Sequence, residues 1–157
     1  MRHLTERLDA AQPVGLLLTR LVIGGLFVHH GIDKYLTGGS TIETMFASWG
    51  VPAVIVTATF TMMLEVFGGL ALIAGRFTRS AAGSLALLLL FAIYYVKLDL
   101  GIISSGPMPG AELDLAYIAA LLTLITQGPG RWSWDHARRR AHDDATAGEQ
   151  AGAALPA

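Results

Sequence analysis

Hydrophobic residues gather in four long segments that are separated by short polar stretches, at about 13–32, 51–74, 80–96 and 111–127. An α-helix rises 1.5 Å per residue, so about 20 apolar residues cross the roughly 30 Å of hydrocarbon in a bilayer. The pattern therefore predicts an all-α fold, an integral membrane four-helix bundle. The segment at 111–127 is short for a membrane span.

Proline and glycine residues mark the ends of the first and last segments. Pro13 suits the first turn of the first span, and the Gly-Pro-Gly sequence at 128–130 ends the fourth. Between the first two spans, Ser40 followed by Glu43 has the pattern of a helix-capping box. We therefore expect a short interfacial helix in this first outer loop.

The composition supports a membrane protein and excludes several kinds of chemistry. Hydrophobic residues make up 53% of the chain and charged residues 15%, with a mean hydropathy of +0.52. The sequence has no cysteine, which excludes disulfides, thiolate metal sites and dithiol redox chemistry within this chain. Any redox role needs a bound cofactor or a partner. We expect contact with the lipid bilayer and no binding of nucleic acid.

Basic residues are concentrated on one side of the predicted spans. That side contains Arg2, Arg7, Arg76, Arg79, Arg131, Arg138, Arg139 and Arg140. The opposite loops contain only Lys34 and Lys97. Since positively charged loops stay in the cytoplasm, both termini are predicted to be cytoplasmic.

These features divide the chain into three parts. Residues 1–12 form a cytoplasmic N-terminal tail, 13–135 the transmembrane domain and 136–157 a C-terminal tail that begins with basic residues. From Ala141 onward the sequence is rich in alanine, glycine and acidic residues and has no apolar face. The end of the chain is therefore predicted to be disordered.

Arg20 and Glu65 lie deep inside the first and second spans. Arg20 is about 10 Å from the cytoplasmic start of its span, and Glu65 is about 15 Å from the cytoplasmic end of its own. A charge in hydrocarbon costs about 2.5 to 3.5 kcal/mol on insertion scales, so it usually faces a partner inside the protein. We predict that Arg20 and Glu65 form an intramembrane pair. The pair could be purely structural, or it could also bind a ligand or a proton. In the alternative interpretation, Arg20 extends to the lipid headgroups and forms no such pair.

Helical phase places small residues beside both charges. One arc of the first span contains Arg20, Gly24, Phe27, Gly31 and Lys34. One arc of the second contains Ala58, Thr61, Glu65 and Gly69. Because small residues let helices approach closely in lipid, we predict helix packing at Gly24, Gly31, Gly69 and Gly75.

A second polar cluster is predicted near the outer surface, from His30, Lys34 and Glu112. Glu112 shares an arc of the fourth span with Ala116 and Ala119, and Asp114 points elsewhere. Both carboxylates also have a simpler interpretation, since the helix dipole favours negative charge at a helix N-terminus. No metal site is expected, because His29 and His30 project about 100° apart.

Four segments resemble the DoxX family of small four-span bacterial membrane proteins: "LLLTRLVIGGLFVHHGIDKY", "WGVP", "LEVFGGLALIAGRFTR" and "ELDLAYIAALLTLITQGPGRWSWD". The resemblance covers about Leu16 to Asp135. Its matching positions are Arg20, Gly24, His30, Gly31, Lys34, Pro52, Glu65, Gly69, Gly75, Arg79 and Glu112. It implies a multi-pass protein of the bacterial inner membrane.

The resemblance also implies a redox context, since the family is associated with membrane oxidoreductase assemblies. These include a thiosulfate:quinone oxidoreductase subunit and complexes linked to oxidative-stress defence. We therefore expect a subunit or scaffold of an oxidoreductase complex, with other protein subunits as partners and a quinone or another small amphipathic ligand between its helices. Such a subunit is either non-catalytic or interacts with quinone, and no catalytic residue is assigned. The lack of cysteine argues against relatives that handle disulfides.

Two other functions stay open. A small proton-coupled transporter could use Glu65, although the multidrug transporters of this size have their glutamate in the first span, where this chain has Arg20. An enzyme that acts alone ranks lowest, because the sequence has no nucleophile-base set, metal cluster or phosphate loop.

Overall fold

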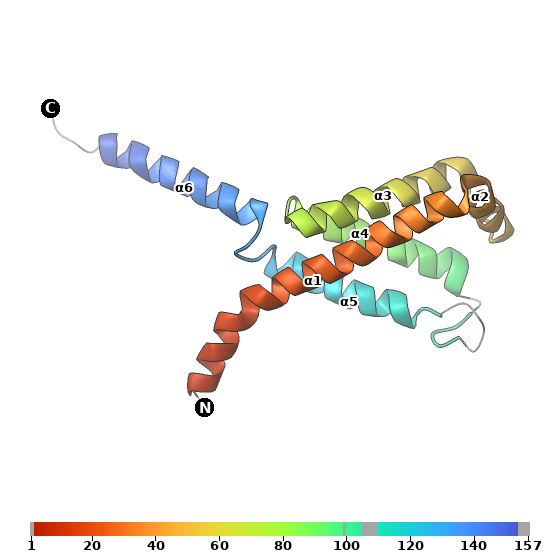
Figure 1. Ribbon diagram of the computed structural model, residues 1–157, viewed down its shortest axis with the longest axis horizontal. Coiled ribbons are helices and arrows are strands. Elements are labelled where there is room, and N and C mark those ends of the chain that lie inside the picture. The colour runs from red at the N-terminus through yellow and green to blue at the C-terminus, as the bar shows by residue number, and fades with distance from the viewer. Residues whose placement is uncertain (1, 99, 105–109, 154–157) are drawn as a thin grey trace.

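The computed structural model describes residues 2–98, 100–104 and 110–153, and within these residues the only regular structure is helical. Figure 1 shows the order of the elements. They are α1 (Arg2–Thr37), α2 (Gly39–Ser48), α3 (Val54–Ala74), α4 (Thr78–Ala92), the π-helix η1 (Ile93–Lys97), α5 (Glu112–Gln127) and α6 (Trp134–Ala153).

Three of the described helical segments are long and apolar enough to cross a membrane, at Ala10–Thr37, Val54–Ala74 and Thr78–Lys97. The all-helical membrane fold expected from the hydrophobic pattern is therefore confirmed. The fourth predicted span corresponds to α5, which has 16 residues and a length of about 24 Å. Because about 20 residues normally cross the hydrocarbon, the crossing by α5 stays a prediction.

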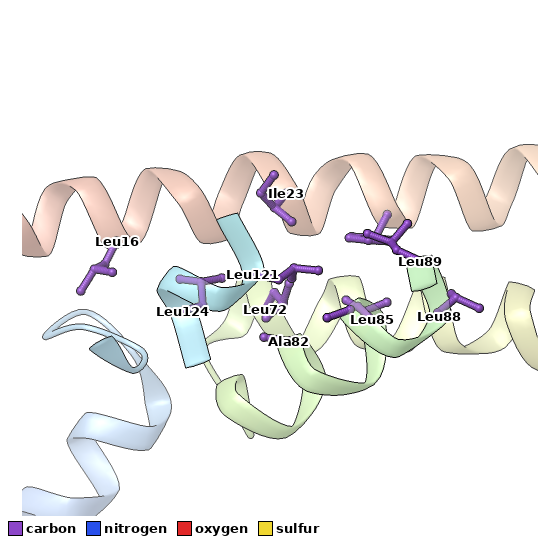
Figure 2. Packing of buried hydrophobic residues seen from close by; sticks show 11 residues of the cluster. Leu16, Ile23, Leu72, Ala82, Leu85, Leu88, Leu89, Leu121 and Leu124 are labelled. Atoms are coloured by element: carbon purple, nitrogen blue, oxygen red, sulfur yellow. The ribbon is translucent and has the colours of Figure 1, made fainter. Parts of the chain in front are cut away.

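Helices α1, α3, α4 and α5 pack around one hydrophobic core, and each of them contacts two of the others. α1 lies antiparallel along α3, α3 contacts α4, α4 contacts α5, and α5 returns to α1. Figure 2 shows leucines of these helices meeting in the core, among them Leu16, Leu72, Leu85 and Leu121. α2 lies at one end of this arrangement, and α6 and both termini lie at the other (Figure 1). The two ends of the molecule are therefore built from different elements.

Glycines bring α1 and α3 into backbone contact. A β-carbon at Gly24 would lie 2.7 Å from the carbonyl oxygen of Gly69, and one at Gly69 would lie 2.5 Å from that of Gly24. Two turns further along α1, a β-carbon at Gly31 would lie 2.9 Å from the carbonyl oxygen of Met62. Side chains at these positions would force the helices apart, so the glycines set the α1–α3 spacing.

The N-terminal part of α1 differs from the prediction, because the helix does not begin at Pro13. It begins at Arg2 and contains Pro13, and it changes direction in this region (Figure 1). A proline inside a helix removes one hydrogen bond and bends the helix, and it need not end it. The residues before Pro13 include leucine, alanine, glutamate and arginine, which favour helix on both sides of the bend.

The first outer loop contains the expected short helix, with a different start. α2 begins after Gly38, whose φ is 98°, and no side chain caps it. Ser40 is therefore inside the helix and is not its N-cap. Ile42 and Phe46 are buried and pack with Val51 and Ala58, which docks α2 on the start of α3. The interfacial position of α2 stays a prediction.

The C-terminal segment is helical where disorder was predicted. α6 continues to Ala153, and the side chains of residues 141–147 are exposed. Alanine, arginine, glutamate and glutamine are strong helix formers even when nothing packs against them. The missing apolar face correctly indicated that this segment lies outside the core, but it did not exclude a helix.

Asp135 joins the start of α6 to the turn between α3 and α4. Its carboxylate accepts hydrogen bonds from the backbone N–H groups of Phe77 at 2.9 Å and Thr78 at 3.0 Å, and from the Thr78 hydroxyl at 3.1 Å. Partial burial raises the pKa of Asp135, but these hydrogen bonds, with the attraction of Arg139, outweigh it and lower the pKa below its ordinary value. Asp135 therefore caps the N-terminus of α4 from a distant part of the chain.

Replacing Gly24 by alanine is expected to destabilise the protein by about 1 to 3 kcal/mol, because the new methyl group would overlap the backbone of α3. Thermal unfolding in detergent measures the change. Gly25→Ala is the matched control, since a β-carbon at Gly25 meets no atom within 4 Å. Equal stability of the two variants would contradict the close contact between the helices.

Replacing Asp135 by asparagine is expected to destabilise the protein by about 1 kcal/mol at pH 7, because an amide NH₂ would face backbone donors. The pKa of Asp135 is lower in the folded state, so its contribution is complete above the ordinary aspartate value of 3.8 and is lost as the pH falls through the folded value. The difference between the unfolding temperatures of the two proteins should therefore become smaller as the pH is lowered from 7 to 3. Asp143→Asn, at an exposed position of α6, should match the wild type throughout.

Candidate functional site

Arg20 is buried, with 1% of its surface exposed, and its guanidinium binds backbone carbonyl groups. Its Nε donates to the Leu72 carbonyl at 2.9 Å, and its Nη2 donates to Ile73 at 3.1 Å. Its Nη1 donates to Pro129 at 2.6 Å and to Trp132 at 3.0 Å. One side chain on α1 thus connects the end of α3 with the loop before α6.

The end of α3 is a favourable place for this cation. The last four carbonyl groups of a helix have no partner within the helix and carry partial negative charge. Gly75, with φ of 68°, ends α3 in the left-handed conformation, and a β-carbon there would lie 2.5 Å from the Arg20 guanidinium. Glycine at this position therefore permits both the turn and the contact with Arg20.

The predicted pair of Arg20 with Glu65 is wrong, because the structure gives each residue another partner. Arg20 binds Leu72, which is seven residues beyond Glu65, about 10 Å along α3. The prediction measured depth from the ends of the two hydrophobic segments. The glycine contacts instead place Gly24 beside Gly69, so Arg20 reaches the end of α3 and Glu65 lies nearer the opposite end of α1.

Glu65 forms an ion pair with Lys34, in which Lys34 Nζ donates to Glu65 Oε1. The Glu65 side chain is 7% exposed and that of Lys34 is 28% exposed, so the carboxylate lies deeper than the ammonium group. Glu65 Oε2 is buried and has no hydrogen-bond partner among the residues that the structure describes. The carboxylate therefore keeps one free acceptor.

Lys97 and Asp114 form a second ion pair, with side chains that are 12% and 9% exposed. Lys97 is the last residue of η1, and π-helical turns often occur at functional sites. Asp114 lies in the first turn of α5, where the helix dipole favours a negative charge. This pair joins the end of the α4–η1 helix to the start of α5.

Both ion pairs line one cavity of about 310 Å³. It lies at the end of the molecule that contains α2 (Figure 1), and α1, α2, α3, the α4–η1 helix and α5 all contribute to its wall. The polar residues in its wall are His30, Lys34, Thr61, Glu65, Lys97, Asp114 and Tyr117. The rest of the wall is largely apolar and includes Phe27, Trp49, Leu88 and Phe91. The cavity can therefore surround an apolar ring and offer charged groups at its edges.

The outer cluster differs from the predicted one in the residue contributed by α5. His30 and Lys34 line the cavity, although His30 is also exposed, but Glu112 is exposed and lies outside the cavity. The buried face of α5 contains Asp114, Leu121 and Leu124, and the arc that begins at Glu112 points outward. The prediction chose the face with small residues, but the face with Leu121 and Leu124 packs in the core.

Lys97, Asp114, Trp49 and Tyr117 are site residues that the sequence did not identify. The spacing of Asp114, Tyr117, Leu121 and Leu124 follows one helical face and could have placed Asp114 inside. Lys97 had no such signal, because its direction depends on the π-helical turn of η1.

Comparison with known proteins places this chain among membrane proteins. The DoxX family profile matches residues 15–98. The chain is 32% identical to an uncharacterised membrane protein of Mycobacterium tuberculosis over 148 residues, 89% of each chain. It is 30% identical to the inner membrane protein YphA of Escherichia coli over 133 residues, which are 80% of this chain and 91% of that protein.

A further relative is CatD of Bacillus subtilis, which is provisionally named an oxidoreductase. It is 32% identical over 116 residues, 73% of this chain and 80% of its own length. No solved structure matches the chain significantly.

Replacing Arg20 by lysine is expected to destabilise the protein by about 2 kcal/mol or more, because an ammonium group cannot donate to all four carbonyl groups from one plane. Thermal unfolding in detergent measures the loss. Arg131→Lys makes the same change at an exposed position close to the same loop and should have little effect. If Arg20→Lys unfolded at the wild-type temperature, the guanidinium would not stabilise the end of α3.

Proposed function

This chain belongs to the DoxX family of membrane proteins, and we propose that it binds a small amphipathic molecule with a quinone-type headgroup between its helices. In this proposal the chain is a subunit or scaffold of a membrane-associated oxidoreductase complex. The observation that carries the proposal is the position of both buried ion pairs, Lys34–Glu65 and Lys97–Asp114, in the wall of one largely apolar cavity.

The chemistry of this wall fits a ring with polar substituents. Small-molecule sites are mostly apolar clefts of about 300 to 1,000 Å³ with a few convergent polar groups, and the cavity of about 310 Å³ is at the lower end of that range. Phe27, Trp49 and Phe91 offer aromatic faces to a flat ring. The ammonium groups of Lys34 and Lys97 offer donors to its oxygen atoms.

The redox context rests on two further observations. The provisional name of CatD, an oxidoreductase, supports a similar setting for this chain. The sequence contains no cysteine, so electrons would have to reside on a bound molecule or on a partner subunit. A membrane subunit that presents a lipid-soluble carrier to its partner fulfils both conditions.

The proposed topology has four spans, with α5 as the fourth, in the bacterial inner membrane. The name of the Escherichia coli relative supports this location. The exposed arginines of the α3–α4 turn and of the C-terminal segment lie at the end opposite α2, whereas Lys34 and Lys97 near α2 are paired with carboxylates. The positive-inside rule therefore favours cytoplasmic termini, with the cavity near the outer surface.

Proton-coupled transport by Glu65 has less support. A transport carboxylate must become accessible from both sides of the membrane, but the cavity that contains Glu65 lies at one end of the helices. Toward the other end, the core is filled by Leu16, Leu72 and Leu124 (Figure 2).

The proposal predicts saturable quenching of Trp49 fluorescence by a short-chain ubiquinone. Trp49 lines the cavity, and the two other tryptophans, Trp132 and Trp134, are exposed and lie outside it. A Trp132→Phe/Trp134→Phe protein in lipid nanodiscs leaves Trp49 as the single reporter. Its fluorescence should decrease to a plateau as the quinone is added.

Two substitutions in this background separate binding from collisions in the lipid. Ala92→Phe fills the cavity and should abolish the saturable part. Ala116→Phe adds the same ring at an exposed position of α5 and should preserve it. Quenching that is unchanged by Ala92→Phe would exclude the cavity as the binding site.

Purification of the wild-type chain from its own membranes in mild detergent tests the proposed assembly. An oxidoreductase subunit is expected to co-purify with the chain.

A further inference from the structure

The two oxygens of the Glu65 carboxylate differ in their surroundings. Oε1 accepts the hydrogen bond from Lys34, whose side chain is more exposed than that of Glu65. Oε2 is buried, has no hydrogen-bond partner within the described part of the chain, and belongs to a residue of the cavity wall. A buried carboxylate oxygen without a donor is unfavourable, so this atom is a site for a donor from a ligand.

Two other side chains of the wall, Thr61 and Lys97, have partners of their own. The Thr61 hydroxyl, one turn before Glu65, donates to the Ala58 carbonyl at 2.9 Å. Lys97 pairs with Asp114. Glu65 thus contributes to the cavity wall a buried carboxylate with one unpaired acceptor, beside apolar and aromatic side chains.

We propose that the ligand donates a hydroxyl hydrogen to Glu65 Oε2, so that the cavity selects the reduced hydroquinone over the oxidised quinone. This proposal rests on the function proposed above and specifies its ligand. The carbonyl oxygens of a quinone accept hydrogen bonds and cannot donate one, whereas each hydroxyl of a hydroquinone can do both. A quinone oxygen at this position would face the carboxylate oxygen with no hydrogen between them. The reduced form would place a charge-assisted hydrogen bond there.

Three ligands of similar shape test this preference on the wild-type protein. They are trimethylhydroquinone, trimethylbenzoquinone and the dimethyl ether of the hydroquinone, measured by anaerobic isothermal titration calorimetry in nanodiscs. The hydroquinone should bind about tenfold or more tightly than the other two, as expected for one hydrogen bond to a charged group. The ether keeps the ring and both oxygens but has no donor, so it isolates the contribution of the hydroxyl hydrogen.

Glu65→Gln should abolish the preference. Lys34 can only donate, so it holds the amide oxygen of the new side chain and leaves the NH₂ group at the former position of Oε2. The cavity then presents a donor in place of an acceptor. A quinone carbonyl and a hydroquinone hydroxyl can both accept from it, so the two ligands should bind with similar affinity. Glu112→Gln makes the same change at an exposed residue outside the cavity and should keep the wild-type order.

The possible results distinguish this inference from the function on which it rests. If none of the three ligands binds, both the proposed function and the inference fail. If all three bind with equal affinity, or if the quinone binds most tightly to the wild type, the cavity is a ligand site but the hydroxyl contact to Glu65 is wrong. The ligand series decides the question even if Glu65→Gln does not fold.

Discussion

The close contact between α1 and α3 determines which charges can meet. Gly24 and Gly69 allow the two backbones to touch, and this contact fixes how far one helix is displaced along the other. Arg20 then lies beside the last carbonyl groups of α3, and Lys34 lies beside Glu65. A shift by one turn, about 5 Å, would separate both sets of partners. The polar interactions of the core therefore depend on an interaction between residues that have no side chains.

The sequence predicted the helices and two of their buried faces well. The hydrophobic segments correspond to α1, α3, α4 with η1, and α5, and the arcs around Arg20 and Glu65 are the buried ones. The partners of those charges could not be predicted, because hydropathy locates a span only to within a turn or more, and pairing depends on a displacement of that size. The π-helical turn before Lys97 adds a second uncertainty, since it rotates the side chains that follow it.

The charged side chains have different kinds of partner at the two ends of the molecule. At the end with α6, Arg20 is neutralised by carbonyl dipoles and Asp135 by backbone N–H groups, so no ligand is needed to complete either site. At the end with α2, two lysines meet two carboxylates around a cavity, and Glu65 Oε2 has no hydrogen-bond partner in the described part of the chain. The first arrangement stabilises the fold. The second has the capacity to recognise a molecule, and the family relationship places that recognition in a membrane.

The contacts of Arg20 also have a consequence for biosynthesis. The chain is made from its N-terminus, so α1 and α3 enter the membrane while Pro129, Trp132 and Asp135 are still to be translated. Until those residues arrive, the guanidinium has only the carbonyl groups of α3 as partners, and the N-terminus of α4 has no cap. A loop that is synthesised after α1 and α3 therefore completes the packing between these two helices.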